Sequence, residues 1–364
     1  MTSKYEVDLY HCDWTQSHWK ASLRRIPAIV ILILAGIFYG QTAPAVLAGA
    51  AAFSVGFGAV RHVRGSRLLA MIATTLLMAF SAWAGSLAGN SHYAVIPATA
   101  LWGLACGLFN VLSEDLGWIV MQAAVALLVA TAFPSHGLAA VARALLILIG
   151  GLTQIGCIAL LWRLEGVRRF GDESASTSIP PADLPAFPEV WKQFRESLRF
   201  SSNAFHYGLR VAATLVLAVE LDHFLQLKNG YWLPMTTVVI LKPDFYRTYT
   251  GGVQRVVGTL TGVIAATAIA HLLQPQNFVL LSLCVFFAYF AYVFQKANPV
   301  LFSTSLTSFV VFLIALTGLP EATVTWHRLI NTALGCALAL VARFVSFKLL
   351  RPLIPMSPFK EAPH

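Results

Sequence analysis

The stretch Asn229-Gly230-Tyr231-Trp232-Leu233-Pro234 decides the fold of this chain, together with Lys242-Pro243-Asp244 and Arg255-Val256-Val257-Gly258-Thr259-Leu260-Thr261-Gly262 downstream of it. An apolar run is broken by a proline, ends in a charged turn and restarts behind an arginine. The restarted run is rich in small residues, which let helices approach one another closely inside a membrane. The pattern predicts a short or interrupted helix, a tight turn and a closely packed second helix.

The composition of the whole chain agrees with a membrane setting. Of the 364 residues, 57% are apolar and only 11% are charged, whereas soluble domains have roughly a quarter of charged residues. A soluble protein of this size needs more polar surface than these residues supply. The sequence therefore predicts an all-α polytopic membrane protein.

Apolar runs of about the length of a membrane span form two sets of six on either side of a polar segment. We expect about twelve transmembrane helices, of which the second in each set is marginal in length. The first set lies at 23–40, 43–60, 68–88, 93–112, 116–133 and 139–162, and the second at 206–227, 230–241, 252–273, 277–295, 298–318 and 325–347.

The two sets resemble a duplication. Pro44 and Pro234 recur at nearly the same offset as Arg67 and Arg255 and as Arg143 and Arg328. Because each set has an even number of crossings, both insert in the same orientation, related by a pseudo-twofold axis along the membrane normal. The expected parts are a cytoplasmic N-terminus at 1–22, a six-helix repeat at 23–162, a linker at 163–203, a second six-helix repeat at 204–349 and a tail at 350–364.

The placement of positive charge predicts the topology. With a cytoplasmic N-terminus, the inner loops carry nearly all lysines and arginines, and the outer loops carry only Lys228. This bias predicts that both termini lie in the cytoplasm. The net charge of +9 then reflects topology rather than nucleic-acid binding.

The linker is rich in Ser and Pro between 174 and 188 and then becomes amphipathic. Trp191, Phe194 and Leu198 share one helical face, with basic residues toward the other. We expect a helix that lies on the inner leaflet or packs on the protein's own cytoplasmic side.

Two further motifs, Phe205-His206-Tyr207-Gly208-Leu209-Arg210 and Arg328-Leu329-Ile330-Asn331-Thr332-Ala333-Leu334-Gly335, accompany the opening stretch. Together they resemble the fusaric-acid-resistance family of bacterial inner-membrane proteins, which includes aromatic acid exporters. The resemblance covers roughly residues 200–347, with a weaker echo in the first half. It implies proton-driven efflux of aromatic carboxylic acids, and cooperation with a periplasmic adaptor protein.

Arg143 and Arg328 are the first candidates for substrate contact. Both lie near the outer ends of the predicted sixth spans, where arginine is costly unless it faces protein or water. Two guanidinium groups on one axis suit a carboxylate. The alternatives are that both reach the outer headgroups, or that Arg328 pairs with Glu321.

Other candidates gather around the short span. Tyr231 and Trp232 belong either to the interfacial aromatic belt or to a wall that stacks on an aromatic substrate, beside Pro234, Thr236 and Thr237. Basic residues at the predicted cytoplasmic helix ends form either a vestibule for anions or contacts to lipid phosphate. These vestibule candidates are Arg67, Arg210 and Arg255.

Proton coupling requires a titratable group partly removed from water. The candidates are Glu220, Asp222 and His206. The alternative for Glu220 and Asp222 is that they lie, with His223, in a solvated loop. Asp244 is expected to cap the cytoplasmic turn, and Glu114 and Asp115 to lie in a solvated inner loop.

Catalytic signatures are absent from the sequence. It contains no phosphate-binding loop, no HExxH and no nucleophile elbow. The five cysteines have no CxxC spacing, which argues against a metal centre or a disulfide framework. We expect no enzyme activity and no cofactor or metal.

The sequence thus favours a secondary transporter that exports organic anions. One alternative is a passive anion channel similar to the plant aluminium-activated malate channels, whose pore lies between two six-span subunits. The other is a membrane anchor that recruits partners through the linker.

Overall fold

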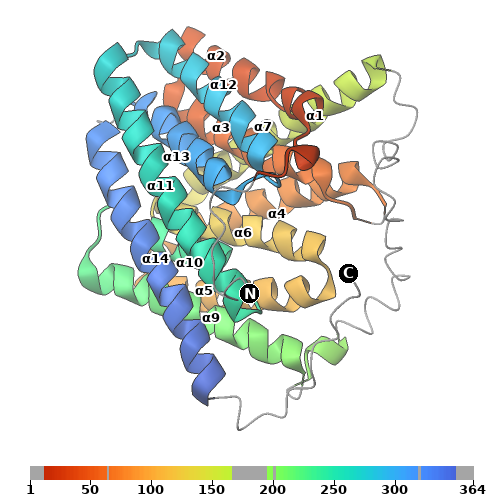
Figure 1. Cartoon of the computed structure of the whole chain (residues 1–364), viewed down its shortest axis with the longest axis vertical. Helices are drawn as coiled ribbons and strands as arrows, with labels where there is room; N and C mark the ends of the chain where they lie inside the picture. Colours follow the sequence, from red (N-terminus) through yellow and green to blue (C-terminus); the bar gives the residue numbers. More distant parts are fainter. Residues whose placement is uncertain (1–11, 64, 166–194, 200–201, 319–320, 350–364) are drawn as a thin grey trace.

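The structure is a computed structural model that describes residues 12–63, 65–165, 195–199, 202–318 and 321–349. Within these residues the regular elements are helices, as the sequence predicts, and ten are long and apolar enough to cross a membrane. Trp191 and Phe194 of the predicted linker helix lie outside the described residues. The chain is an all-helical membrane protein in the part described (Figure 1).

The apolar runs of the first half became helices close to their predicted bounds. A short helix α1 (Trp19–Leu23) leads into the first crossing, and Ser66 caps α4 by accepting a hydrogen bond from the backbone N–H of Leu69 at 3.2 Å. The remaining helices are α2 (Pro27–Phe38), α3 (Thr42–Gly56), α4 (Arg67–Ala88), α5 (His92–Leu112), α6 (Glu114–Thr131) and α7 (Gly137–Leu164).

The second half departs further from the prediction. Its helices are α9 (Asn203–Leu225), α10 (Trp232–Ile240), α11 (Phe245–Leu273), α12 (Asn277–Phe294), α13 (Pro299–Ala315) and α14 (Glu321–Leu349). The carboxylate of Asp244 accepts a hydrogen bond from the backbone N–H of Arg247 at 2.8 Å, so Asp244 caps α11 as expected. Because α11 therefore begins at Phe245, Arg255 lies well inside the helix. The prediction that Arg255 opens this span at the membrane face is wrong.

Pro44 and Pro234 also act differently from the prediction. Each is the third residue of its helix, in α3 and in α10. A proline in the first turn removes an N–H that has no partner within the helix, so it favours a helix start. The prolines begin these helices and do not interrupt them.

Packing within each half follows the same pattern. In the first half, α4 packs against α6 and α7, and α3 packs against α7. In the second half, α11 packs against α13 and α14, and α10 packs against α14. Contacts between the halves follow the same rule. The helix α5 of the first half lies beside α9, the first helix of the second half, and the corresponding helix α12 lies beside α2, a helix of the first crossing (Figure 1).

The short helix α10 lies in the middle of the structure (Figure 1). It contacts α6 of the first half, and α9 and α14 of its own half. Seven of its nine residues are buried: Trp232, Leu233, Pro234, Thr236, Thr237, Val238 and Ile240. Four residues of the predicted substrate wall, Trp232, Pro234, Thr236 and Thr237, are therefore buried, whereas Tyr231, just before the helix, is partly exposed.

Glycines bring several helices into backbone contact. A Cβ added at Gly150 of α7 would lie 2.1 Å from the carbonyl oxygen of Ala48 in α3, and one at Gly335 of α14 would lie 2.7 Å from the carbonyl oxygen of Leu233 in α10. The seam between α5 and α9 is equally close, because a Cβ at Gly107 would lie 2.2 Å from the Cα atom of Gly208. Small residues are what allow membrane helices to pack this way.

Replacing Gly150 with alanine should lower the free energy of unfolding in detergent by about 1–3 kcal/mol, because α7 must move away from α3. Gly156 on the same helix is exposed, with open space around it, so Gly156→Ala should leave stability unchanged or raise it by up to about 1 kcal/mol. Thermal unfolding of both variants checks this. Equal effects at the two positions would contradict the close contact.

Candidate functional site

Arg328 is a buried cation at the centre of the second half. It lies on α14, is only 1% exposed, and its Cζ atom lies 4.0 Å from the ring centroid of Trp232. Among the described residues, its Nε and Nη1 atoms have no hydrogen-bond acceptor. The interior position excludes contact with outer headgroups. The side chain of Glu321, the predicted alternative partner, lies outside the described residues.

Arg255 is a second buried cation. It lies on α11, is 6% exposed, and its Nε atom also lacks an acceptor among the described residues. Its charge acts on that of Arg328, so the two guanidinium groups belong to one region. The prediction that Arg255 lines a cytoplasmic vestibule is therefore wrong, because the residue is enclosed by helices.

Buried hydroxyl groups near α11 add further donors. The hydroxyls of Thr259 on α11 and Thr307 on α13 are buried without partners in the described part of the chain. Thr237 on α10 differs, because its hydroxyl donates to the carbonyl oxygen of Leu233 at 2.9 Å. A buried donor without an acceptor costs free energy. A ligand made of acceptors, such as an anion, would remove that cost.

A row of aromatic rings extends from the site of Arg328 toward the first half. The ring of Trp232 lies 5.0 Å from that of Tyr231, which lies 5.8 Å from that of Phe133. The ring of Trp232 thus lies against the guanidinium, and Tyr231 and Phe133 extend the row away from it.

Arg143 occupies a different environment from Arg328. It is partly buried and donates hydrogen bonds to the hydroxyl of Ser86 and to the carbonyl oxygen of Phe133. Both hydrogen bonds come from Nη1, so this nitrogen is paired with groups of the first half. The structure does not bring the two arginines together as an equivalent pair, although Phe133 connects Arg143 to the aromatic row.

A cavity of about 280 Å³ opens between α5, α6, α9 and α10. Its lining includes His92, Asp222, His223, Tyr231 and Pro234. The Nε2 atom of His92 lies 3.0 Å from a carboxylate oxygen of Glu220, and the rings of His92 and His223 stack with centroids 4.1 Å apart. His92 comes from the first half and its partners from the second. Within the described residues, no group of His, Cys, Asp and Glu is arranged to hold a metal ion.

The proton-coupling candidates are only partly brought together. Glu220 and Asp222 lie in the last turns of α9, and Asp222 packs so tightly on Gly230 that a Cβ there would lie 1.5 Å from its Oδ1 atom. Both residues lie in α9 and not in a loop, although the side chain of Glu220 is still 42% exposed. His206 lies fourteen residues earlier on α9, which is about 20 Å along the helix axis.

The other vestibule candidates do not form one basic surface. Arg67 is 9% exposed, and its Nε atom donates to the Nε2 atom of His62 at 3.0 Å. Arg210 on α9 faces a different cation, Arg343 on α14, closely enough for their charges to act on each other. Sequence reasoning missed Arg343 as a partner of Arg210, because the contact between the two helices is tertiary.

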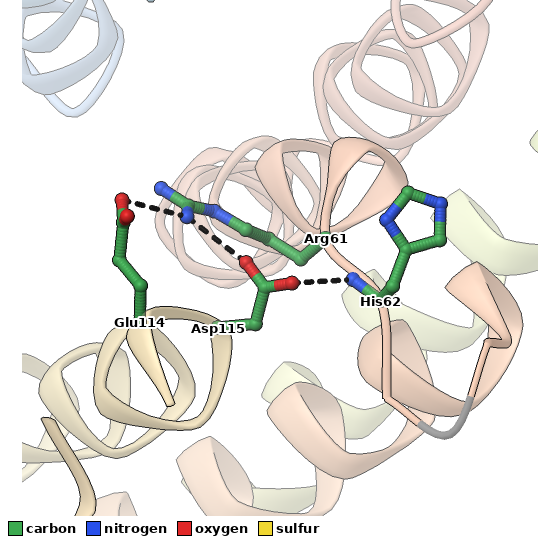
Figure 2. Close-up of polar contacts among 4 residues, drawn as sticks. All are labelled: Arg61, His62, Glu114 and Asp115. Carbon is green, nitrogen blue, oxygen red and sulfur yellow. Dashed lines mark hydrogen bonds and ion pairs between the residues drawn. The ribbon is translucent and has the colours of Figure 1, made fainter. Parts of the chain in front are cut away.

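A polar cluster joins the loop before α4 to the start of α6. Figure 2 shows Arg61 between two acids, 3.2 Å from Glu114 and 3.0 Å from Asp115. Asp115 also accepts a hydrogen bond from the backbone N–H of His62 at 2.9 Å. Burial lowers the pKa of Lys242, while the charge of Glu114 opposes that shift, so the second half also reaches this cluster. Glu114 is exposed as predicted, but Asp115 is not fully solvated.

Comparison with known proteins supports the resemblance to the fusaric-acid-resistance family. The model of the family "Fusaric acid resistance protein-like" matches residues 212–342. That range holds α10, α11 and most of α14, and so both buried arginines. The predicted resemblance is confirmed for this part of the chain.

Several curated proteins are similar in sequence. The chain is 25% identical to the uncharacterized protein ORF2 of Neisseria gonorrhoeae over 47% of this chain and 41% of that protein. It is 25% identical to the inner membrane protein YccS of Escherichia coli, over 42% of this chain and 21% of YccS. It is 27% identical to the uncharacterized protein YhfK of the same organism, over 43% of this chain and 22% of YhfK. The chain thus matches less than half of the length of these relatives. No solved structure matches the chain.

Removing the carboxylate of Asp115 by Asp115→Ala should lower the free energy of unfolding by about 1–3 kcal/mol, because Arg61 and the His62 N–H lose a shared acceptor. Glu114→Ala should cost less than about 1 kcal/mol, since that side chain is 86% exposed. Thermal unfolding in detergent measures the difference. A larger loss for Glu114→Ala would contradict the role given to Asp115.

Proposed function

We propose that this protein is a secondary transporter that exports organic anions, chiefly aromatic carboxylates, across a bacterial inner membrane. The observation that carries the proposal is Arg328, a fully buried cation that stacks on Trp232 and has two donor atoms without acceptors in the described part of the chain. Arginine inside a membrane bundle is costly, and such residues commonly mark a substrate path.

The chemistry of the site fits an anion that also carries a ring. A carboxylate can accept two parallel hydrogen bonds from one guanidinium group. Trp232 and Tyr231 lie beside that group and offer apolar faces for an aromatic substrate. The match to the fusaric-acid-resistance family over residues 212–342 supports the same substrate class.

The duplicated packing supports a two-repeat arrangement with about twelve crossings. The two halves have the same internal helix contacts and reciprocal contacts with each other. An even number of crossings in each half would insert both in one orientation. The bias of lysine and arginine toward one side supports cytoplasmic termini. In this orientation the cavity beside His92 opens on the outer side, where an exported anion would leave.

The outer cavity supports coupling to protons. Glu220 bears the ion pair with His92, and Asp222 and His223 are its neighbours. The imidazole of His92 carries a positive charge only when it is protonated, so a change of protonation at this contact would alter the attraction between α5 and α9, and thus between the two halves. A proton that enters from the outer side would therefore alter the contact between His92 and Glu220, beside the cavity through which the anion leaves. A periplasmic adaptor remains part of what the family resemblance implies.

In proteoliposomes, Arg328→Gln should reduce the transport of labelled benzoate about tenfold or more, because the anion loses its charged partner. Arg163→Gln is the matched control, since Arg163 is exposed at the end of α7. Wild-type transport by Arg328→Gln, in a variant that folds normally, would remove the assignment of Arg328.

Glu220→Gln should abolish the stimulation of benzoate transport by a pH gradient while benzoate exchange without a gradient continues. Glu196→Gln, at an exposed position, should leave the stimulation unchanged. The measurement is uphill accumulation in vesicles with imposed pH and voltage. Wild-type flux that follows voltage alone would favour a passive channel over a coupled transporter.

A further inference from the structure

The two buried arginines carry two positive charges that the described residues do not neutralise. The charges and titratable groups that act on Arg328 are Arg255 and Tyr231, and the one that acts on Arg255 is Cys336. A phenol and a thiol are neutral when protonated. No carboxylate among the described residues acts on either guanidinium, so the pair is a region of net positive charge inside the bundle.

One carboxylate is too little charge for this region. Bidentate pairing with a single guanidinium uses both oxygens of a carboxylate. A bound monoanion would therefore leave the second cation unpaired in a low-dielectric interior, which is strongly unfavourable. A ligand with two negative charges would neutralise both cations.

The arginines are also separated along the helices. A Cβ at Gly252 of α11 would lie 3.9 Å from the Cβ atom of Cys336 of α14. These two residues therefore lie at the same height along the two helix axes. Arg255 lies about one turn from Gly252, and Arg328 lies just over two turns from Cys336 in the same direction. The Cα atoms are thus offset by about 7 Å along the axes, a spacing suited to two anionic groups on one molecule.

Further donors lie on the side of Arg255. Thr259 follows Arg255 by one turn on the same face of α11, and both are buried. Gly262 brings this face against α13, where Thr307 lies. Trp232 lies on the side of Arg328. One anionic group would therefore bind beside the indole ring and the other beside Arg255, while Thr259, about 6 Å further along α11 in the direction of Arg328, lies at a level between the two.

We propose that Arg255 is a specificity-determining residue that makes the site select aromatic acids with two negative charges over those with one. The inference rests on the proposed function, since it assigns the substrate class of that site. Arg328 holds the first carboxylate against Trp232, and Arg255 holds the second. Loss of Arg255 turns the site into one for monoanions.

The test compares two acids that share a ring, benzoate and benzene-1,4-dicarboxylate, at a pH where all carboxyl groups are ionised. Transport by the purified protein in proteoliposomes gives an apparent affinity for each. The wild-type protein should favour the dicarboxylate by about tenfold or more. In Arg255→Gln this preference should disappear, because the affinity for the dicarboxylate falls by about tenfold or more.

Two controls keep the test decisive. Arg255→Lys retains the charge and should retain a preference for the dicarboxylate. Arg247→Gln removes an exposed arginine from the first turn of α11 and should not change the ratio. Equal affinities in the wild-type protein, or equal losses for both acids in Arg255→Gln, would overturn the role of Arg255 while leaving anion transport intact. Transport of neither acid by the wild-type protein would instead count against the proposed function.

Discussion

A guanidinium group buried among apolar helices needs a negative charge, and the helices around Arg328 supply none in the described part of the chain. This constraint accounts for the form of the second half. The helix α10 begins with Trp232, whose ring covers the cation. Gly335, seven residues after Arg328, lets α14 lie against the backbone of α10. Both features hold the cation in place without neutralising it, so the charge remains available to a ligand.

The two halves have diverged at corresponding positions. Arg143 and Arg328 both precede a glycine by seven residues, and both glycines make a close backbone contact with a helix that has proline in its first turn. Arg143, however, is only partly buried and donates from Nη1 to Ser86 and to the carbonyl oxygen of Phe133. The same scaffold thus contains one arginine bound to groups of the first half and one that is fully buried with donors unpaired in the described part of the chain. The family match, which covers only the second half, falls on the arginine with unused donors.

The sequence predicted most of the helices because a membrane span needs a long apolar run, and such runs are visible in composition alone. The sequence was less reliable for helix starts and for contacts between helices, which depend on tertiary packing. Proline was interpreted as a break, but the first turn of a helix tolerates it, as α3 and α10 illustrate. Arg255 seemed to open a helix because the polar residues 245–251 preceded it, yet Asp244 caps α11 earlier. The pairing of His92 with Glu220 joins residues of different halves, and nothing in their spacing indicates it.

The seam between α5 and α9 has a mechanical consequence. Gly107 and Gly208 meet there backbone to backbone, and the side chains of Leu104 and Leu108 of α5 pack beside Gly208. Any shift of one helix against the other would therefore have to move these leucines as well. The ion pair of His92 and Glu220 lies near one end of the same two helices. Gly107 lies near the end of α5 and Gly208 near the start of α9, so a change in the ion pair would act on the end of the seam that is farthest from this close contact.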